Sequence, residues 1–473
     1  MSAAETKHEA VPVLALAAMA LGVFVIANDF TALSVALPKM ESDLGTDLTT
    51  VQWVINAYAL VFGVLIVTGG RLADLFGRKR VFMIGTTVFA VFSVLGGIAP
   101  NVEVVIVCRA LMGIGGALMW PAVLGMTYAI LPDDKAGLAG GLILGVAGLG
   151  NAVGPMLGGF LTDTLSWRWL FFINLPIALF AMFVTWREVD ESAADAAERR
   201  IDYFGVAALS IAVVSILLAL DEGTDAGFTS PAILGLFASG FVFFAAFVFI
   251  ERRQGAAALI PNDVLRNKVF AAACASVLLM SAIFFSALLY LPQFFSKVLD
   301  YSAVKSGAGL LPMMGVFAAT SFVAGSLYER LGAKVIVSLG AAFLGIGIFM
   351  LSFIETGSSY GSLVAGMVVL GIGVGLFYSS ITTSAVTALD PSRSSLAGGI
   401  VYMCQIEGGA VGLGLNTAIV ASASNLADGI SLAFRVDTGL AVLGFVVAVM
   451  FVGGHEPVEG HARHLRRHHR ANA

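Results

Sequence analysis

The sequence predicts an all-α polytopic membrane protein, and three observations point to this fold class. Of the 473 residues, 58% are hydrophobic and only 12% are charged, whereas about 25% of the residues in a soluble domain are charged. The chain holds 54 glycines, and glycine is enriched where membrane helices pack closely. Apolar runs of the roughly 20 residues that a helix needs to cross a bilayer recur along the whole chain.

Fourteen such runs are predicted to span the membrane. In order, they cover residues 11–37, 50–70, 81–99, 103–130, 137–161, 169–186, 203–220, 231–250, 269–291, 306–327, 335–354, 361–381, 396–418 and 437–453. The first run is too long for a cleavable signal peptide and leads directly into further spans, so no signal peptide is expected.

The orientation of the spans follows from the lysines and arginines, which collect in the cytoplasmic segments of membrane proteins. If both termini are cytoplasmic, 20 of the 26 lysines and arginines lie in cytoplasmic segments, and Arg109 lies inside a span. The outer segments then hold the remaining five, which are Lys39, Arg168, Lys297, Lys305 and Arg435. We therefore expect both termini in the cytoplasm and a multi-pass protein of the cell membrane.

The composition also argues against other classes of protein. The net charge of −5 is made of mixed charges, so no nucleic-acid partner is expected. Cys108, Cys274 and Cys404 each lie alone in a predicted helix, without the spacing of a metal site or a disulfide. With no nucleotide-binding loop, metal-ligand cluster or nucleophile–base set evident, we expect neither an enzyme nor a cofactor.

Two polar stretches, residues 187–202 and 251–268, divide the chain. We expect a six-helix bundle over 1–187, two additional helices with cytoplasmic linkers over 188–268, a second six-helix bundle over 269–454, and a basic, histidine-rich cytoplasmic tail over 455–473. The tail is expected to be solvated or to bind lipid headgroups, with metal binding as the alternative.

An internal repeat supports this division. "GRLADLFGRK" (70–79) follows the second span, and "GSLYERLGAK" (325–334) follows the second span of the later six. The two segments share Gly, Leu, an acidic residue, Gly and Lys at the same offsets. Repeated halves related by an axis along the membrane normal are typical of a transporter that rocks about a central site.

Several motifs, in their shared order, carry a resemblance to a known family. They are "NDFTALSVALP" (28–38), "VQWVINAYAL" (51–60), "GGRLADLFGRKR" (69–80), "RALMGIGGA" (109–117), "GLILGVAGLGNAVGPMLGG" (141–159), "SWRWLFFINLP" (166–176) and "LLYLPQFF" with "SGAGLLP" (288–312). Together they resemble the fourteen-span drug–proton antiporter branch of the major facilitator superfamily, although Met112 replaces the usual glutamine. The resemblance implies a major facilitator fold and efflux of a solute, driven by entry of protons. We expect a monomer.

Asp29 and Arg109 are the first candidates for proton coupling. Counted at about 1.5 Å per residue from the outer ends of their spans, they lie roughly 12 and 9 Å deep. An ion pair would offset much of the cost of burying both charges. The pair is either a fixed structural contact or, as the family resemblance implies, a site where Arg109 tunes the proton affinity of Asp29.

Glu407 is the third candidate, because it lies near the middle of the span over 396–418. A carboxylate there costs roughly 3 kcal/mol on insertion scales. No basic residue of the second half lies at a comparable depth, and burial without a partner favours the neutral form. Glu407 is therefore expected to bind protons or a cationic solute; the alternative is a protonated glutamate bonded to backbone.

Polar and aromatic side chains on the spans are candidates for lining a substrate cavity, with interfacial anchoring or interhelix bonding as the alternative. They are Gln52, Trp53, Asn56, Tyr58, Trp120, Asn151, Tyr290 and Gln405. Large apolar rings with few hydrogen-bonding groups suit lipophilic cations or other amphipathic solutes.

Two glycine-containing motifs are candidates for moving parts. Gly70, Asp74, Gly77, Arg78 and Arg80 lie in a cytoplasmic loop, where Asp74 can meet a helix N-terminus or an arginine and form a conformational latch. The alternative is that the basic residues only set the orientation of the spans.

In the span over 137–161, Gly150, Gly154 and Gly158 recur at every fourth residue and give a smooth ridge for a neighbouring helix. Gly159 and Pro155 complete this antiporter motif, and the proline can bend the helix. Gating or plain helix packing would each explain it.

These observations together predict a proton-coupled exporter of amphipathic or cationic compounds that works by alternating access. The alternatives are an exporter of a specific lipid, metabolite or siderophore, and a non-transporting membrane receptor.

Overall fold

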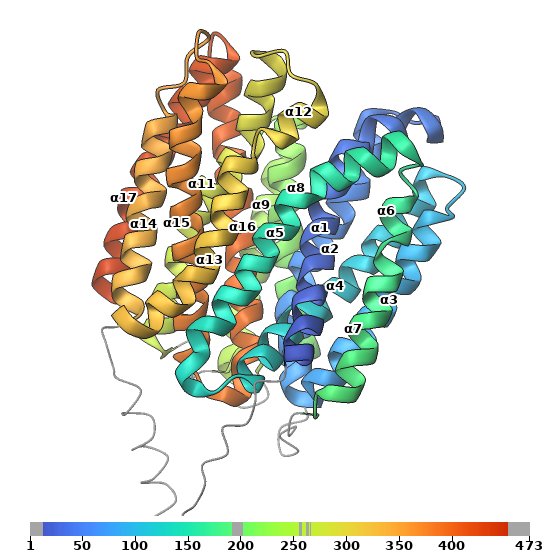
Figure 1. Cartoon of the computed structure of the whole chain (residues 1–473), viewed down its shortest axis with the longest axis vertical. Helices are drawn as coiled ribbons and strands as arrows, with labels where there is room; N and C mark the ends of the chain where they lie inside the picture. Colours follow the sequence, from blue (N-terminus) through green and yellow to red (C-terminus); the bar gives the residue numbers. More distant parts are fainter. Residues whose placement is uncertain (1–12, 192–201, 255–257, 262–263, 265, 453–473) are drawn as a thin grey trace, which may run out of the picture.

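The computed structural model describes residues 13–191, 202–254, 258–261, 264 and 266–452. Within these residues, 14 helices are long and apolar enough to cross a membrane, which confirms the predicted all-α fold with fourteen spans (Figure 1). The predicted tail over 455–473, and the part of the predicted linker over 192–201, lie outside the described residues.

The helices follow the predicted order. The first six spans are α1 (Val13–Leu44), α2 (Leu48–Phe76), α3 (Arg78–Gly97), α4 (Val102–Ile130), α5 (Ala136–Thr164), and α6 (Trp169–Phe172) with α7 (Asn174–Glu188). Then come α8 (Tyr203–Ala226) and α9 (Pro231–Gln254). The last six are α11 (Lys268–Lys297), α12 (Ala303–Ala308) with α13 (Leu311–Leu331), α14 (Ala333–Leu351), α15 (Tyr360–Thr387), α16 (Ser394–Ser422) and α17 (Leu426–Phe451).

Short polar side chains fix where several helices begin. Asp47 accepts a hydrogen bond from the backbone N–H of Thr50 at the start of α2, and Asn267 and Asn425 cap α11 and α17 in the same way. Each cap satisfies a backbone donor that the first turn of a helix leaves unpaired.

Glycines separate consecutive helices at the two copies of the repeat. Gly77, between α2 and α3, has φ 104°, and Gly332, between α13 and α14, has φ 81°. Side chains disfavour this left-handed region, so the glycine shared by the two copies has a conformational reason.

The largest difference between a predicted and an observed boundary is at the start of α17. α17 begins at Leu426, whereas the hydropathy pattern predicts a start at residue 437. The polar side chains of Asp428, Arg435 and Asp437 interrupt the apolar pattern, but the cap at Asn425 starts a regular helix. Arg435 therefore lies on α17, with an exposed side chain, and not in an outer loop.

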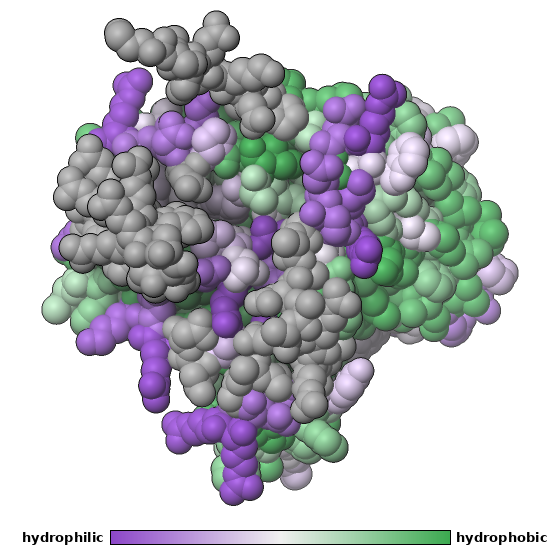
Figure 2. Space-filling model, turned by 90° about the horizontal axis from the view of Figure 1, so that it is seen from below, coloured by the Kyte–Doolittle hydropathy of each residue, from purple (hydrophilic) through white to green (hydrophobic). Residues whose placement is uncertain are grey.

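The helices pack in two sets. α1 to α7 contact one another, and α11 to α17 contact one another. α8 packs against α2, α16 and α9, so it lies between α9 and the two sets. Both described ends of the chain lie at the lower end of Figure 1, which we call the terminal end. Seen from this end, hydrophilic side chains lie on the face and hydrophobic side chains form the periphery (Figure 2), as expected for a bundle surrounded by lipid.

Candidate functional site

The two sets of helices meet tightly at the terminal end. α2 runs against α16, and α5 against α13. A Cβ atom at Gly70 would lie only 2.6 Å from the carbonyl oxygen of Ser395, and one at Gly399 only 2.8 Å from that of Ile66. On the other side, Gly137 and Gly325 approach each other just as closely. Backbone therefore meets backbone, and the terminal end is closed.

Asp74 binds across the contact between α2 and α16. Its Oδ2 accepts a hydrogen bond from the N–H of Leu396 at 2.8 Å, and its Oδ1 accepts one from the N–H of Ser395 at 3.3 Å. These donors are the first turn of α16, where the helix dipole favours a negative charge. The carboxylate thus holds the start of a helix from the other set.

Arg78 reinforces this contact. Its guanidinium pairs with Asp74 at 3.1 Å and donates to the carbonyl oxygen of Pro391 at 2.6 Å. The side chains of Arg78 and Asp74 are 7% and 4% exposed, so water screens the pair weakly.

Two residues predicted for this latch point elsewhere. Arg80 has an exposed side chain that pairs with Glu191 at 3.6 Å, and a Cβ at Gly77 would also meet Glu191. Glu191 follows α7, so these contacts stay on the side of the first six spans. Arg80 and Gly77 are therefore corrected: they support the loop and do not cross to the second set.

Glu329 occupies the position of Asp74 in the second copy of the repeat, and it was not predicted as a site residue. Its carboxylate accepts a hydrogen bond from the N–H of Leu138, in the first turn of α5, at 3.3 Å. Each copy of the repeat thus places a carboxylate at the start of a helix from the opposite set. The repeat itself was the signal that could have identified Glu329.

A cavity of about 410 Å³ lies between the two sets, within the size range of small-molecule sites. On α2 it is lined by Trp53 and Asn56, which precede the close contact at Gly70 by several turns. On α16 it is lined by residues from Tyr402 to Thr417, which follow the contact at Ser395. The cavity therefore lies beyond the closed terminal end, toward the opposite end.

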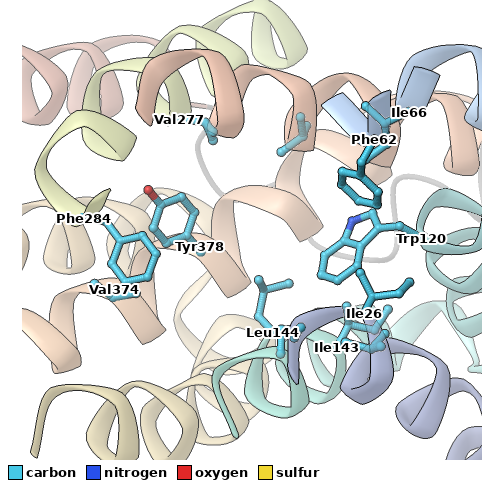
Figure 3. Close-up of a cluster of buried hydrophobic side chains, with 14 of the residues drawn as sticks. Ile26, Phe62, Ile66, Trp120, Ile143, Leu144, Val277, Phe284, Val374 and Tyr378 are labelled. Carbon is cyan, nitrogen blue, oxygen red and sulfur yellow. The ribbon is translucent and has the colours of Figure 1, made fainter. Parts of the chain in front are cut away.

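Aromatic side chains from both sets form much of the wall. The rings of Trp120 and Tyr402 lie 4.4 Å apart between centroids, although they come from α4 and α16. Trp120 and Phe284, which both line the cavity, lie on opposite sides in Figure 3, with Leu144 of α5 between them. α8 adds three leucines to the lining: Leu217, Leu218 and Leu220.

Five of the predicted cavity residues line this space, namely Trp53, Asn56, Trp120, Asn151 and Gln405. The other three do not, and their predicted role is corrected. Gln52 is exposed on the outer part of α2, Tyr58 is fully buried beneath Arg109, and Tyr290 is turned to Thr417, to which it hydrogen bonds at 2.8 Å.

Asp29 and Arg109 form a buried ion pair, as their depths predict. Arg109 also donates from Nε to the carbonyl oxygen of Val54 at 2.7 Å and lies 4.2 Å from the ring of Tyr58. Asn174 donates to the second oxygen of Asp29 at 3.2 Å. The pair thus joins α1, α2, α4 and α7. Asp29 itself is one residue from Phe30, which lines the cavity.

Glu407 does not line the cavity. It lies one turn before Val411, whose side chain is 48% exposed on the outer side of α16. Its Oε1 atom is buried and has no hydrogen-bond partner among the described residues. The order of residues predicts its depth but not its direction around the helix, and its binding of protons or of a cationic solute stays a prediction.

The glycine motif of α5 has two faces. Gly150, Gly154 and Gly158 pack on α1, where a Cβ at Gly150 would lie 2.9 Å from Ala27. Pro155 and Gly159 instead face Gly307 and Val304 of α12, in the second set. The three glycines of the ridge thus hold α5 to α1 in its own set. The face with Pro155 and Gly159 contacts α12 of the other set, beyond the cavity.

The sequence of the chain is similar to those of known transporters. The profile of the Major Facilitator Superfamily matches residues 19–321 and 313–471. The chain is 33% identical over 409 residues to the multidrug resistance protein Stp of Mycobacterium tuberculosis, covering 86% of this chain and 76% of the relative. It is 33% identical over 436 residues to the puromycin resistance protein pur8 of Streptomyces alboniger, covering 91% and 86%.

A solved structure shares the fold. The human organic anion transporter MFSD10 (TETRAN) superposes with a TM-score of 0.66 over 92% of this chain and 99% of that chain, at 14% identity. The chain belongs to the Major Facilitator Superfamily, and it is a membrane transporter of small molecules rather than an enzyme.

Proposed function

We propose that the chain exports amphipathic or cationic compounds across the cell membrane in exchange for protons, with both termini in the cytoplasm. The observation that carries this proposal is the aromatic cavity, closed at the terminal end, with the buried carboxylate of Asp29 one residue from its wall. Relatives named for multidrug and puromycin resistance are consistent with such substrates.

The wall of the cavity suits these substrates chemically. Trp120, Tyr402 and Phe284 present aromatic faces, which attract organic cations. Asn56, Asn151 and Gln405 add a small number of hydrogen-bonding groups. Such a lining binds large apolar solutes with modest demands on their polar groups.

Proton coupling is assigned to Asp29 and Arg109. When Asp29 is ionised, it neutralises Arg109 in a site with little water. Protonation of Asp29 removes its ion pair with Arg109, whose guanidinium keeps its contacts with Val54 and Tyr58. The network among α1, α2, α4 and α7 then changes its charge, and we propose that this change biases the two sets toward opening at the terminal end.

A second candidate is an exporter of one particular natural compound. Relatives named as a tetracenomycin C resistance and export protein and as a cephamycin export protein favour it. A panel of chemically unrelated cations separates the two, since a dedicated exporter responds to one compound class alone.

The test uses purified protein in vesicles with a preformed pH gradient and ethidium as the probe. Ethidium should collapse the gradient with the wild type, and Asp29→Asn should abolish this response, whereas Glu103→Gln, an exposed carboxylate on α4, should retain it. Glu407→Gln should weaken the response less than Asp29→Asn, because Glu407 does not line the cavity. A gradient that stays intact with the wild type for every cation in the panel would contradict the proposal.

A further inference from the structure

A second carboxylate is fully buried among the last six spans. Asp437 lies in the middle of α17 with 0% of its surface exposed. α17 packs against α11, α14 and α16, so three helices enclose this side chain. Asp437 takes no part in the cavity wall, the closed terminal end or the Asp29 network.

The partners of Asp437 are neutral. Asn416 on α16 donates from Nδ2 to both carboxylate oxygens at 3.0 Å, and also to the hydroxyl of Ser286 on α11 at 2.8 Å. No described lysine or arginine forms an ion pair with Asp437, and Arg435 on the same helix is exposed.

Among the residues that the structure describes, the remaining surroundings of Asp437 carry no opposite charge. From α11, the phenol of Tyr290 lies within electrostatic reach of the carboxylate. α14 faces this part of α17 with small residues, since a Cβ at Gly345 would meet Ala441, and its single charged residue, Lys334, is exposed near the terminal end. A buried carboxylate without a cation carries a large desolvation cost in its charged form.

An orphaned acceptor beside Asp437 shows what the cluster lacks. The Oδ1 atom of Asn416 is buried and has no hydrogen-bond partner among the described residues. A charged carboxylate is only an acceptor, whereas a protonated one has an O–H to donate. With a proton on Asp437, rotation of the Asn416 amide brings Oδ1 to the place that Nδ2 now occupies. There Oδ1 accepts a hydrogen bond from the protonated carboxyl group and one from the hydroxyl of Ser286. The proton thus gives this acceptor a donor that a charged carboxylate cannot supply.

The cluster also borders the cavity. Thr417, the residue after Asn416, lines the cavity and hydrogen bonds to Tyr290 at 2.8 Å. Thr417 thus connects the cavity wall to Tyr290, whose phenol is within electrostatic reach of Asp437, and the two hydroxyls offer a route for a proton.

We propose that Asp437 is a second proton-binding site, in the last six spans, which exchanges its proton with the cavity by way of Thr417 and Tyr290. This inference rests on the proposed antiport, and it gives each set of helices its own buried acid. The negative charge of Asp29 is neutralised by Arg109, whereas that of Asp437 is neutralised by the proton it binds.

The test measures protons released when ethidium is added to the purified full-length protein in weakly buffered detergent solution. Asp437→Asn keeps the shape but cannot release a proton, so release should fall by about one proton per transporter, the capacity of one carboxyl group. Asp437→Glu should restore it, and Asp437→Asn combined with Asp29→Asn should lower it further than either change alone.

The outcomes separate this inference from the proposed function. Wild-type protein that releases no protons contradicts both. Wild-type release that Asp437→Asn leaves unchanged overturns the inference and spares the antiport. If Asp437→Asn does not fold, infrared spectra of the wild type decide: the carbonyl band of a protonated carboxyl group should shift in Asp437→Glu and change on adding ethidium. A band that ethidium does not alter contradicts the inference.

Discussion

The two contacts that close the terminal end are built on the same repeat but differ in strength. Asp74 and Glu329 occupy equivalent positions, and each accepts a hydrogen bond from the first turn of a helix in the opposite set. Asp74 is 4% exposed, has two backbone donors and pairs with Arg78. Glu329 is exposed, and one donor at 3.3 Å is its only described hydrogen bond.

The difference has a cause in the sequence. Arg78 aligns with Ala333 in the second copy of the repeat, so the second contact lacks the arginine that ties the carboxylate to Pro391 in the first. Exposed contacts contribute little because water screens them, whereas a buried charge needs its partner. The repeat therefore sets the position of the carboxylate in each contact. Burial and the neighbouring arginine, Arg78, set how strong the contact is.

The largest effect is expected from Asp74→Asn. The change leaves Arg78 buried without its counter-charge and turns an amide toward backbone donors; losing one member of a buried pair costs about 3–5 kcal/mol. Ethidium efflux from intact cells should fall roughly tenfold or more, with little loss of folded protein in the membrane. Unchanged efflux would remove the latch from the mechanism.

A smaller effect, of similar size at the two contacts that close the terminal end, is expected from replacing the glycines at which the backbones touch. Gly70→Val and Gly325→Val each insert a side chain into a contact that is already too short for a Cβ, and overpacking of this kind costs about 1–3 kcal/mol. Both variants should open the terminal end, measured as faster labelling of Ser395→Cys by a water-soluble maleimide in a background without native cysteines. Gly235→Val, where the space is open, is the control. Faster labelling in only one variant would show that the two contacts open separately.

The smallest effect is expected from Glu329→Gln, which keeps the length of the side chain and removes an exposed charge. Efflux should change by less than about twofold. A loss as large as that of Asp74→Asn would mean that the two contacts are equally strong, and the comparison between them would fail.

Much of the fold could be predicted from the sequence. Hydropathy runs identify the fourteen spans because the lipid requires about 20 apolar residues in each, and counting residues along two spans places Asp29 and Arg109 at similar depth. The largest boundary difference, at α17, arose where polar residues lie on a helix whose neighbours bury Asp437 and leave Arg435 exposed.

The site was harder to predict, because depth along a helix is a local property and direction around it is not. Glu407 and Gln405 lie on the same span, yet only Gln405 lines the cavity. Tyr58 and Asn56 differ in the same way, since Arg109 covers Tyr58. Tertiary packing also gave Asp437 its neutral partners and Glu329 its helix N-terminus.

By itself the sequence determined which segments enter the membrane, where the repeat places its carboxylates and which charges share a depth, since each depends on the order of residues along one helix. Only the tertiary structure decided which side chains meet a cavity, a cation or another helix, because those contacts depend on neighbours that are distant in the chain.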